Sequence, residues 1–193
     1  MSIINELITD RTRADVSRIE RLLSKGWDNM TEEEQDYFLG LSGSYWVPLL
    51  SLDGHELYSL DGEQLQVLEQ TVIAVKGAYN ASDLNRVTEA VEYLATRIRG
   101  YGNNLDALSG QGVWSMEDIP TSDSMRRYLD NVGLIRSSIS VLPSTPSVPD
   151  DMEDLSVDEA NDIEKVLVDV DFLLNNMEAA WLYSGDIYSG EVI

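Results

Sequence analysis

Apolar residues recur at helical spacing along much of this chain, most clearly near its C-terminal end. The motif Ser156-Val157-Asp158-Glu159 has the form of a capping box, in which the first and fourth residues bond each other's backbone amides. The spacing after it predicts a helix over 157–182 with a broad buried face. Its acids Asp158, Asp162, Asp169 and Glu178 are expected on the solvent side. The apolar stripe consists of Ala160, Ile163, Leu167, Val170, Leu174, Met177 and Trp181, widened by Val166, Leu173 and Ala180.

The same period predicts helices over 82–99 and 122–142, the latter ending at Pro143. A further helix is expected between Thr12 and Gly26, and a short one from the capping box Thr31-Glu32-Glu33-Glu34. The three longest apolar stripes need one another, so we expect those helices to pack as neighbours in a bundle. Seven residues should be largely buried there: Leu84, Val91, Leu94, Ile135, Ile163, Val170 and Leu174.

Residues 45–76 interrupt the helical pattern with an eight-residue repeat, Ser-Leu-Asp-Gly followed by two polar residues and Leu. Asp-Gly between alternating apolar residues favours tight hairpin turns. We expect three short antiparallel strands at about 46–52, 55–60 and 63–69. The predicted fold is therefore mostly α, a helical bundle formed by 1–44 and 77–193, with 45–76 as a small inserted antiparallel β-hairpin or meander module.

Two connecting segments stand out by composition. Proline at every third position in 143–151 favours an extended connector, either a strap between two helices or a recognition peptide for an aromatic groove. Residues 100–119 form a glycine-rich loop that carries Trp114.

Composition excludes several kinds of site. The chain has no cysteine and one histidine, His55, which rules out thiolate chemistry, histidine-pair metal sites and most nucleophilic triads. Asp53 and Asp61 in the turns could hold calcium, but the spacing of a calcium-binding loop with its glutamate clamp is missing, which favours plain turns. Paired acids such as Glu164 and Asp171 have no phosphate-binding loop beside them. We expect no enzyme activity, no cofactor and no metal.

The net charge of −22 is concentrated near the end of the chain, where residues 149–193 hold thirteen acids and the single base Lys165. Such a field repels nucleic acid and anionic membranes. The chain has no long apolar run and no signal-peptide pattern at its start, so we expect synthesis in the cytoplasm.

Several segments resemble an uncharacterised structural protein family encoded in the tail-gene regions of phages and prophages of gut Firmicutes. Residues 41–76 depart from the family pattern, and their Asp-Gly repeats resemble short β modules of minor tail proteins. The resemblance implies a protein that works among tail, baseplate and fibre proteins. The matching segments are Asp10-Arg11-Thr12 through Gly26-Trp27, Asn29-Met30-Thr31, 77–87, 114–120, 161–165 and 183–191.

Together with the resemblance, these observations predict a virion structural protein of the phage tail that is made in the host bacterial cytoplasm. It would be a baseplate, fibre-attachment or tip component that contacts other tail proteins and forms a homo-oligomer or is present in several copies in the virion. The alternative is an acidic DNA mimic that inhibits a host defence protein, because carboxylates can stand where a target expects phosphates. The repeat Tyr-Ser-Gly at 183–185 and 188–190 is read either as a docking tail or as a segment that packs on its own bundle. The candidate interaction residues are Tyr183, Ile187, Tyr188, Trp114, Trp46 and Tyr58.

Overall fold

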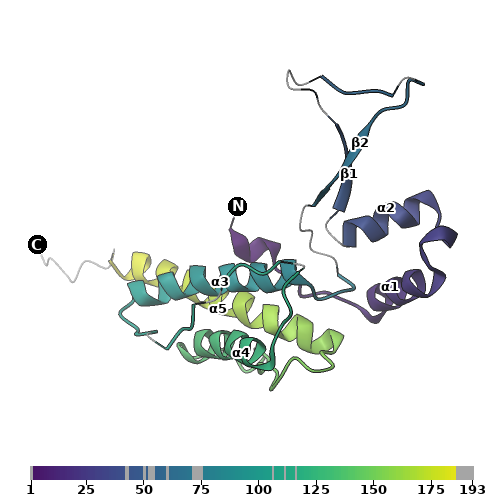
Figure 1. Cartoon of the computed structure of the whole chain (residues 1–193). Coiled ribbons are helices and arrows are strands. Elements are labelled where there is room, and N and C mark those ends of the chain that lie inside the picture. Colours follow the sequence, from purple (N-terminus) through teal and green to yellow (C-terminus); the bar gives the residue numbers. More distant parts are fainter. Residues whose placement is uncertain are drawn as a thin grey trace, which may run out of the picture. The chain divides into compact units, whose positions relative to one another are not determined.

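The chain folds into two compact units in the computed structural model, which is shown in Figure 1. Unit 1 comprises residues 1–11 and 84–193, and unit 2 comprises residues 12–83. The structure describes residues 2–185 except 42–43, 50, 52–54, 60, 71–75, 106, 111 and 116. Most of this part is helical, as the sequence predicts. No helix in it has the length and apolarity to cross a membrane.

Three long helices of unit 1 run in the same direction (Figure 1). They are α3 (Ala81–Gly100), α4 (Ser122–Ser137) and α5 (Val157–Gly185). Arg86 near the start of α3 binds Glu164 near the start of α5, and Arg97 further along α3 binds Asp171 further along α5. Asn103, just past α3, donates to the carbonyl of Ser138, just past α4, at 3.4 Å. The ends of the helices therefore lie together, and each connector must run back along the bundle.

Hydrogen bonds fix the first connector to the helices that it passes. Asn85 of α3 exchanges two bonds with the backbone of Trp114, at 2.7 and 2.8 Å. Asn131 of α4 does the same with the backbone of Ser109, at 2.8 and 2.9 Å. Each amide side chain imitates a peptide group, so a glycine-rich loop obtains the partners that a strand would supply.

The proline-containing connector is fixed in a similar way. Arg136 of α4 donates to the carbonyls of Pro146 and Thr145, and the Thr145 hydroxyl donates to Asp169 of α5 at 2.9 Å. Thr145 is buried in this position. The bonds to both helices agree with the interpretation of this segment as a strap between them.

The core of unit 1 contains all seven residues predicted to be buried. Five central members of the α5 stripe have no exposed surface: Ile163, Val166, Leu167, Val170 and Leu174. At about 25 cal/mol per Å² of apolar area, such burial is the main stabilising term of this unit.

Two predictions about the helices are corrected. Helix α4 ends at Ser137 rather than 142, because the hydroxyls of Ser137 and Ser138 bond the carbonyls of Leu134 and Ile135 and so compete with continued helix. Asp169 is buried and not on the solvent side of α5, since Thr145 and Lys165 both bond its carboxylate.

A buried charge cluster joins the N-terminal segment, α3 and α5. The carboxylate of Glu164, which has no exposed surface, accepts from Arg11 at 2.5 Å and from Arg86 at 2.8 Å. It also accepts from the backbone amide of Ile8 at 2.6 Å. Asn161, one turn earlier on α5, exchanges two 3.0 Å bonds with the backbone of Arg11. The segment before unit 2 is thereby bound to α5.

Unit 2 begins with two short helices, α1 (Arg13–Lys25) and α2 (Glu32–Leu41). The capping box predicted at Thr31 is present, with bonds of 2.8 and 3.3 Å between Thr31 and Glu34. A second box, which the sequence analysis missed, joins Thr12 and Asp15. Leu22 rather than Leu23 is the buried leucine of α1.

The β segment differs from the three consecutive strands predicted at 46–52, 55–60 and 63–69. Strand β1 (Ser44–Pro48) pairs antiparallel with β2 (Gln66–Gln70), with Pro48 opposite Gln66. Among the described residues between them, Tyr58 lies opposite Gln64 in an isolated antiparallel bridge. Pairing across this interval means that a tip, residues 49–65, is carried on a two-stranded stem. The compact units have other bounds than the predicted insert 45–76, so a separate β module over that range stays a prediction.

Candidate functional site

Three leucines of the tip are joined by a closed cycle of backbone hydrogen bonds. The amide of Leu57 donates to the carbonyl of Leu49, that of Leu65 to Leu57, and that of Leu49 to Leu65, each at 2.8 Å. The three residues are spaced eight apart, which is the period of the sequence repeat. We call Leu49, Leu57 and Leu65 the leucine ring.

Chain segments leave the leucine ring in three antiparallel pairs. Two residues outward from the leucines, Ser51 donates to the carbonyl of His55 at 2.8 Å, and Ser59 donates to that of Glu63 at 2.7 Å. At the same step in the stem, Val47 is paired with Val67. The local arrangement is therefore repeated about three times around the ring, with two arms formed by the repeat and the third by β1 and β2.

The two serines explain why the repeat folds in this way. Ser51 Oγ accepts from the amide of His55, and Ser59 Oγ accepts from the amide of Glu63, both at 3.1 Å. Gly62 has φ of +83°, a conformation that side chains disfavour. In each repeat a serine thus closes a turn, and at Gly62 the glycine makes the turn possible.

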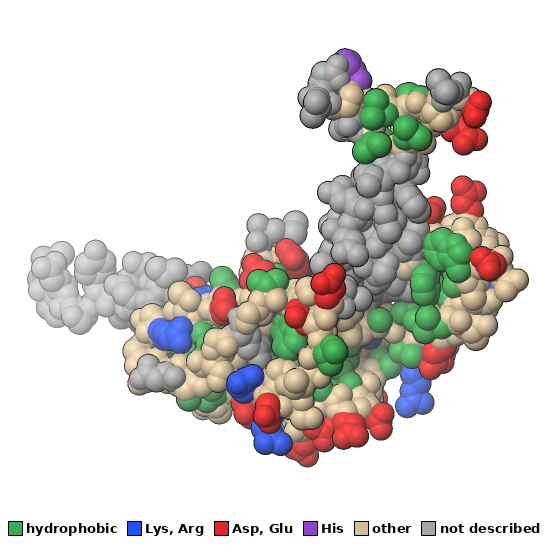
Figure 2. Space-filling view, in the orientation of Figure 1, with side chains coloured by type: hydrophobic (Ala, Val, Ile, Leu, Met, Phe, Trp, Pro, Cys, Tyr) green, Lys and Arg blue, Asp and Glu red, His purple; other side chains and the backbone are tan. Residues whose placement is uncertain are grey.

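The leucine side chains are exposed to a similar extent, at 39% for Leu49, 36% for Leu57 and 39% for Leu65. Glu56, Asp61 and Glu63 nearby are exposed carboxylates. In Figure 2, hydrophobic side chains and acidic ones lie close together in the part of unit 2 that carries His55, the purple residue. The tip presents apolar groups and negative charge together, which suits contact with another protein rather than a small anion.

Tyr58, a predicted interaction residue, belongs to this tip. It is 56% exposed, and its hydroxyl donates to Glu56 at 2.8 Å. Gln64 donates to the same carboxylate at 2.7 Å. The hydrogen bond to Glu56 and the negative charge of that residue raise the pKa of the Tyr58 phenol. The phenol of Tyr58 is thus held in place as a neutral, exposed aromatic group near the leucines.

Trp114, another predicted interaction residue, lies in the connector between α3 and α4. It is half-buried, its backbone is held by Asn85, and its indole N–H finds no acceptor among the described residues. Val113 and Ile119 of the same connector are the exposed residues instead. The interaction role of Trp114 stays a prediction.

The remaining predicted residues are not placed with their side chains. Trp46 lies in β1 and Tyr183 in α5, but their side chains lie outside the described part of the chain. Ile187 and Tyr188 lie outside it altogether. The docking role assigned to them stays a prediction.

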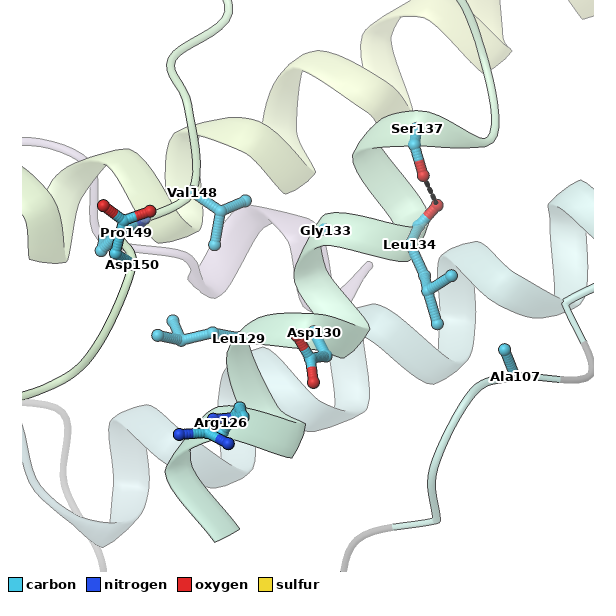
Figure 3. Close-up of a pocket in the computed structure, with 10 residues that line it drawn as sticks. All are labelled: Ala107, Arg126, Leu129, Asp130, Gly133, Leu134, Ser137, Val148, Pro149 and Asp150. Carbon is cyan, nitrogen blue, oxygen red and sulfur yellow. Dashed lines mark hydrogen bonds between the residues drawn. The ribbon is translucent and has the colours of Figure 1, made fainter. Parts of the chain in front are cut away.

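A shallow groove of about 550 Å³ lies on unit 1 along α4 (Figure 3). Val148, Pro149 and Asp150 of the strap form one side, and Arg126, Leu129 and Asp130 of α4 lie opposite. One base beside two acids gives the groove no strong selectivity for either charge. Among the described residues, no group of three histidine, cysteine or acidic side chains is arranged to hold a metal ion.

The leucine ring was not predicted from the sequence, because the Asp-Gly turns indicate hairpins but not which residues meet at their base. The available signal was the leucine that recurs every eight residues, at positions 49, 57 and 65. The buried cluster around Glu164 was not predicted either. The available signal was weaker, namely that its two arginines and its acid all lie in segments that carry the family resemblance.

Protein-family models, curated proteins and solved structures were all compared with the chain, and none matches. The resemblance to a family of phage tail-region proteins therefore stays a prediction, and the argument for function depends on the surfaces described above.

Proposed function

We propose that this chain is a structural protein of a phage tail, a baseplate, fibre-attachment or tip component, that acts through contacts with other tail proteins. The observation that supports this best is the leucine ring, three leucines exposed to a similar extent on a two-stranded stem. Exposed leucines that share one small structure indicate a contact surface more strongly than the scattered apolar residues of an ordinary surface.

The construction of the tip favours binding over catalysis. The cycle that joins the three leucines uses backbone groups, so the exposed parts of the leucine side chains can contact a partner. The acids near them would complement basic groups at the edge of that partner. A rim of charge with an apolar centre is the usual anatomy of a protein interface.

The proposal is tested by changing one leucine and following the protein into particles. Leu57→Ser removes apolar surface but leaves the backbone cycle intact, because the leucine side chains take no part in it. In phage that carry this variant, we expect the amount of the chain per purified virion to fall at least tenfold, measured by quantitative mass spectrometry.

Leu23→Ser is the matched control, because Leu23 is a 60% exposed leucine of α1 that lies outside the tip. It should leave incorporation unchanged, and both variants should keep the melting temperature of the original protein. Absence of the unchanged chain from purified virions would overturn the tail assignment. Equal incorporation of both variants would overturn the role of the leucine ring.

The acids of α5 give less support to the DNA-mimic alternative. Glu164 and Asp169 are buried, and Asp171 and Glu178 are bound to Arg97. These four acids cannot form a row of free charges that resembles a phosphate backbone. Competition with duplex DNA for a basic host nuclease, with strong salt dependence, would be the result in favour of mimicry.

A further inference from the structure

The apolar stripe of α5 continues beyond the part that its own bundle covers. Ile163, Leu167, Val170 and Leu174 have no exposed surface, whereas the next member, Met177, is 36% exposed. Every side chain from Asn175 to Ala180 is classed as exposed, although α5 continues to Gly185. Trp181 is the following member of the stripe in the sequence. The seam that is buried inside unit 1 is thus continued by a helix face that the described residues leave partly exposed.

This helix end also carries little charge. Residues 172–185 contain one ionisable acid or base, Glu178, in a protein with 35 acids and a net charge of −22. Arg97 lies 3.0 Å from the Glu178 carboxylate, and the Tyr101 hydroxyl also donates to it. These contacts lower the pKa of Glu178, the hydrogen bond from Tyr101 being the larger cause. Its charge is therefore retained and locally compensated.

We infer that the exposed end of α5 pairs with the same segment of a second copy of this chain. Two molecules of such high negative charge repel one another, so contact is more favourable at an apolar surface of low charge, such as this one. A stripe that already packs with spacing of three and four inside the bundle can continue to pack with an identical helix outside it. An uncharged apolar face is also self-complementary, as a twofold interface requires.

The pairing is expected to be weak on its own. Fourteen helical residues span about 21 Å, which gives an interface near the lower limit of size for a stable complex. Association should therefore depend on concentration and become effective where many copies are held together. Added salt should strengthen it by screening the repulsion between the acidic bodies.

Two adjacent alanines allow a matched test on the full chain. Ala180 lies on the stripe and Ala179 lies off it, and both are exposed. Ala180→Asp and Ala179→Asp change the net charge and the helix propensity equally. Sedimentation velocity between about 1 and 500 μM protein should show association of the unchanged chain and of Ala179→Asp. For Ala180→Asp, the dissociation constant should rise at least tenfold.

Circular dichroism separates loss of pairing from loss of the helix, because the two variants should keep the same helical signal at low concentration. Association of the unchanged chain should increase between about 50 and 500 mM NaCl. The inference is overturned if the unchanged chain stays monomeric throughout these ranges, or if both variants weaken association equally. It does not depend on the proposed tail function, since it concerns the purified protein alone.

Discussion

Glu164 holds three parts of unit 1 with one carboxylate, because it accepts from Arg11, Arg86 and the amide of Ile8. The two arginines are themselves buried. Burial of an ion is unfavourable unless its partners are present, so removal of the acid leaves two poorly compensated cations in the core.

Glu164→Ala should therefore lower the free energy of unfolding by about 3–5 kcal/mol, measured by urea denaturation. Glu92→Ala, at an exposed position of α3, is the control and should stay within about 0.5 kcal/mol. A loss of stability at Glu164 no larger than in the control would mean that the charge cluster contributes nothing net.

Glu34 shows how local contacts set the titration of an exposed acid. The Lys25 ammonium and the Thr31 amide bond its carboxylate, and they lower the pKa of Glu34 from 4.5 to about 2. Because the folded-state pKa is depressed, the stability from these contacts is present above pH 4.5 and is lost as pH falls towards about 2.

We expect a titration of the Glu34 side chain followed by NMR to give a pKa of about 2 in the unchanged protein. In Lys25→Met, which removes the principal partner, that pKa should move back towards 4.5. No movement in the variant would show that the bond to Lys25 is not formed in solution.

At the scale of elements, local signals were the predictable part of this fold. The caps at Thr31 and Ser156 and the buried stripes of α3 and α5 each depend on residues a few positions apart, and they are confirmed. The direction of the helices and the pairing of β1 with β2 depend on contacts far apart in sequence. Helical periodicity gives no information on either, because a stripe can pack in both directions.

The candidate site follows the same division. The eight-residue repeat and its turns could be read from the sequence, but the cycle that joins Leu49, Leu57 and Leu65 needs all three segments at once. The burial of Asp169 was unpredictable for a similar reason, since its partner Thr145 lies 24 residues away in a connector whose proline spacing predicts an extended chain but not its course past α5.

The tip should be removable without loss of the stem. Pro48 and Gln66 are direct partners across β1 and β2, so Asn-Gly in place of Leu49–Leu65 would join them as a two-residue hairpin. We expect this variant to keep its helical circular dichroism and its cooperative melting. Loss of cooperative melting would show that the tip belongs to the core of unit 2.

At the scale of the whole molecule, the acidic residues differ in how far they are exposed or paired. Some acids of unit 1 are buried or paired, as at Glu164, Asp169 and Asp171, whereas those near the leucine ring are exposed. The two surfaces proposed for contact accordingly suit different partners. The acidic tip fits a protein with basic groups, and the nearly uncharged end of α5 fits another copy of the chain.

The position of Glu164 has a mechanical consequence. The chain passes from unit 1 into unit 2 after Arg11 and returns just before Leu84, so Arg11 and Arg86 stand beside the two crossings. Both are bound to the same carboxylate. A pulling force on unit 2 would reach unit 1 through two chain segments, and both are bound to Glu164 of α5. Neither segment can separate from α5 without breaking its ion pair. The load is therefore shared between the two ion pairs, and the attachment should resist tension better than a single connection would.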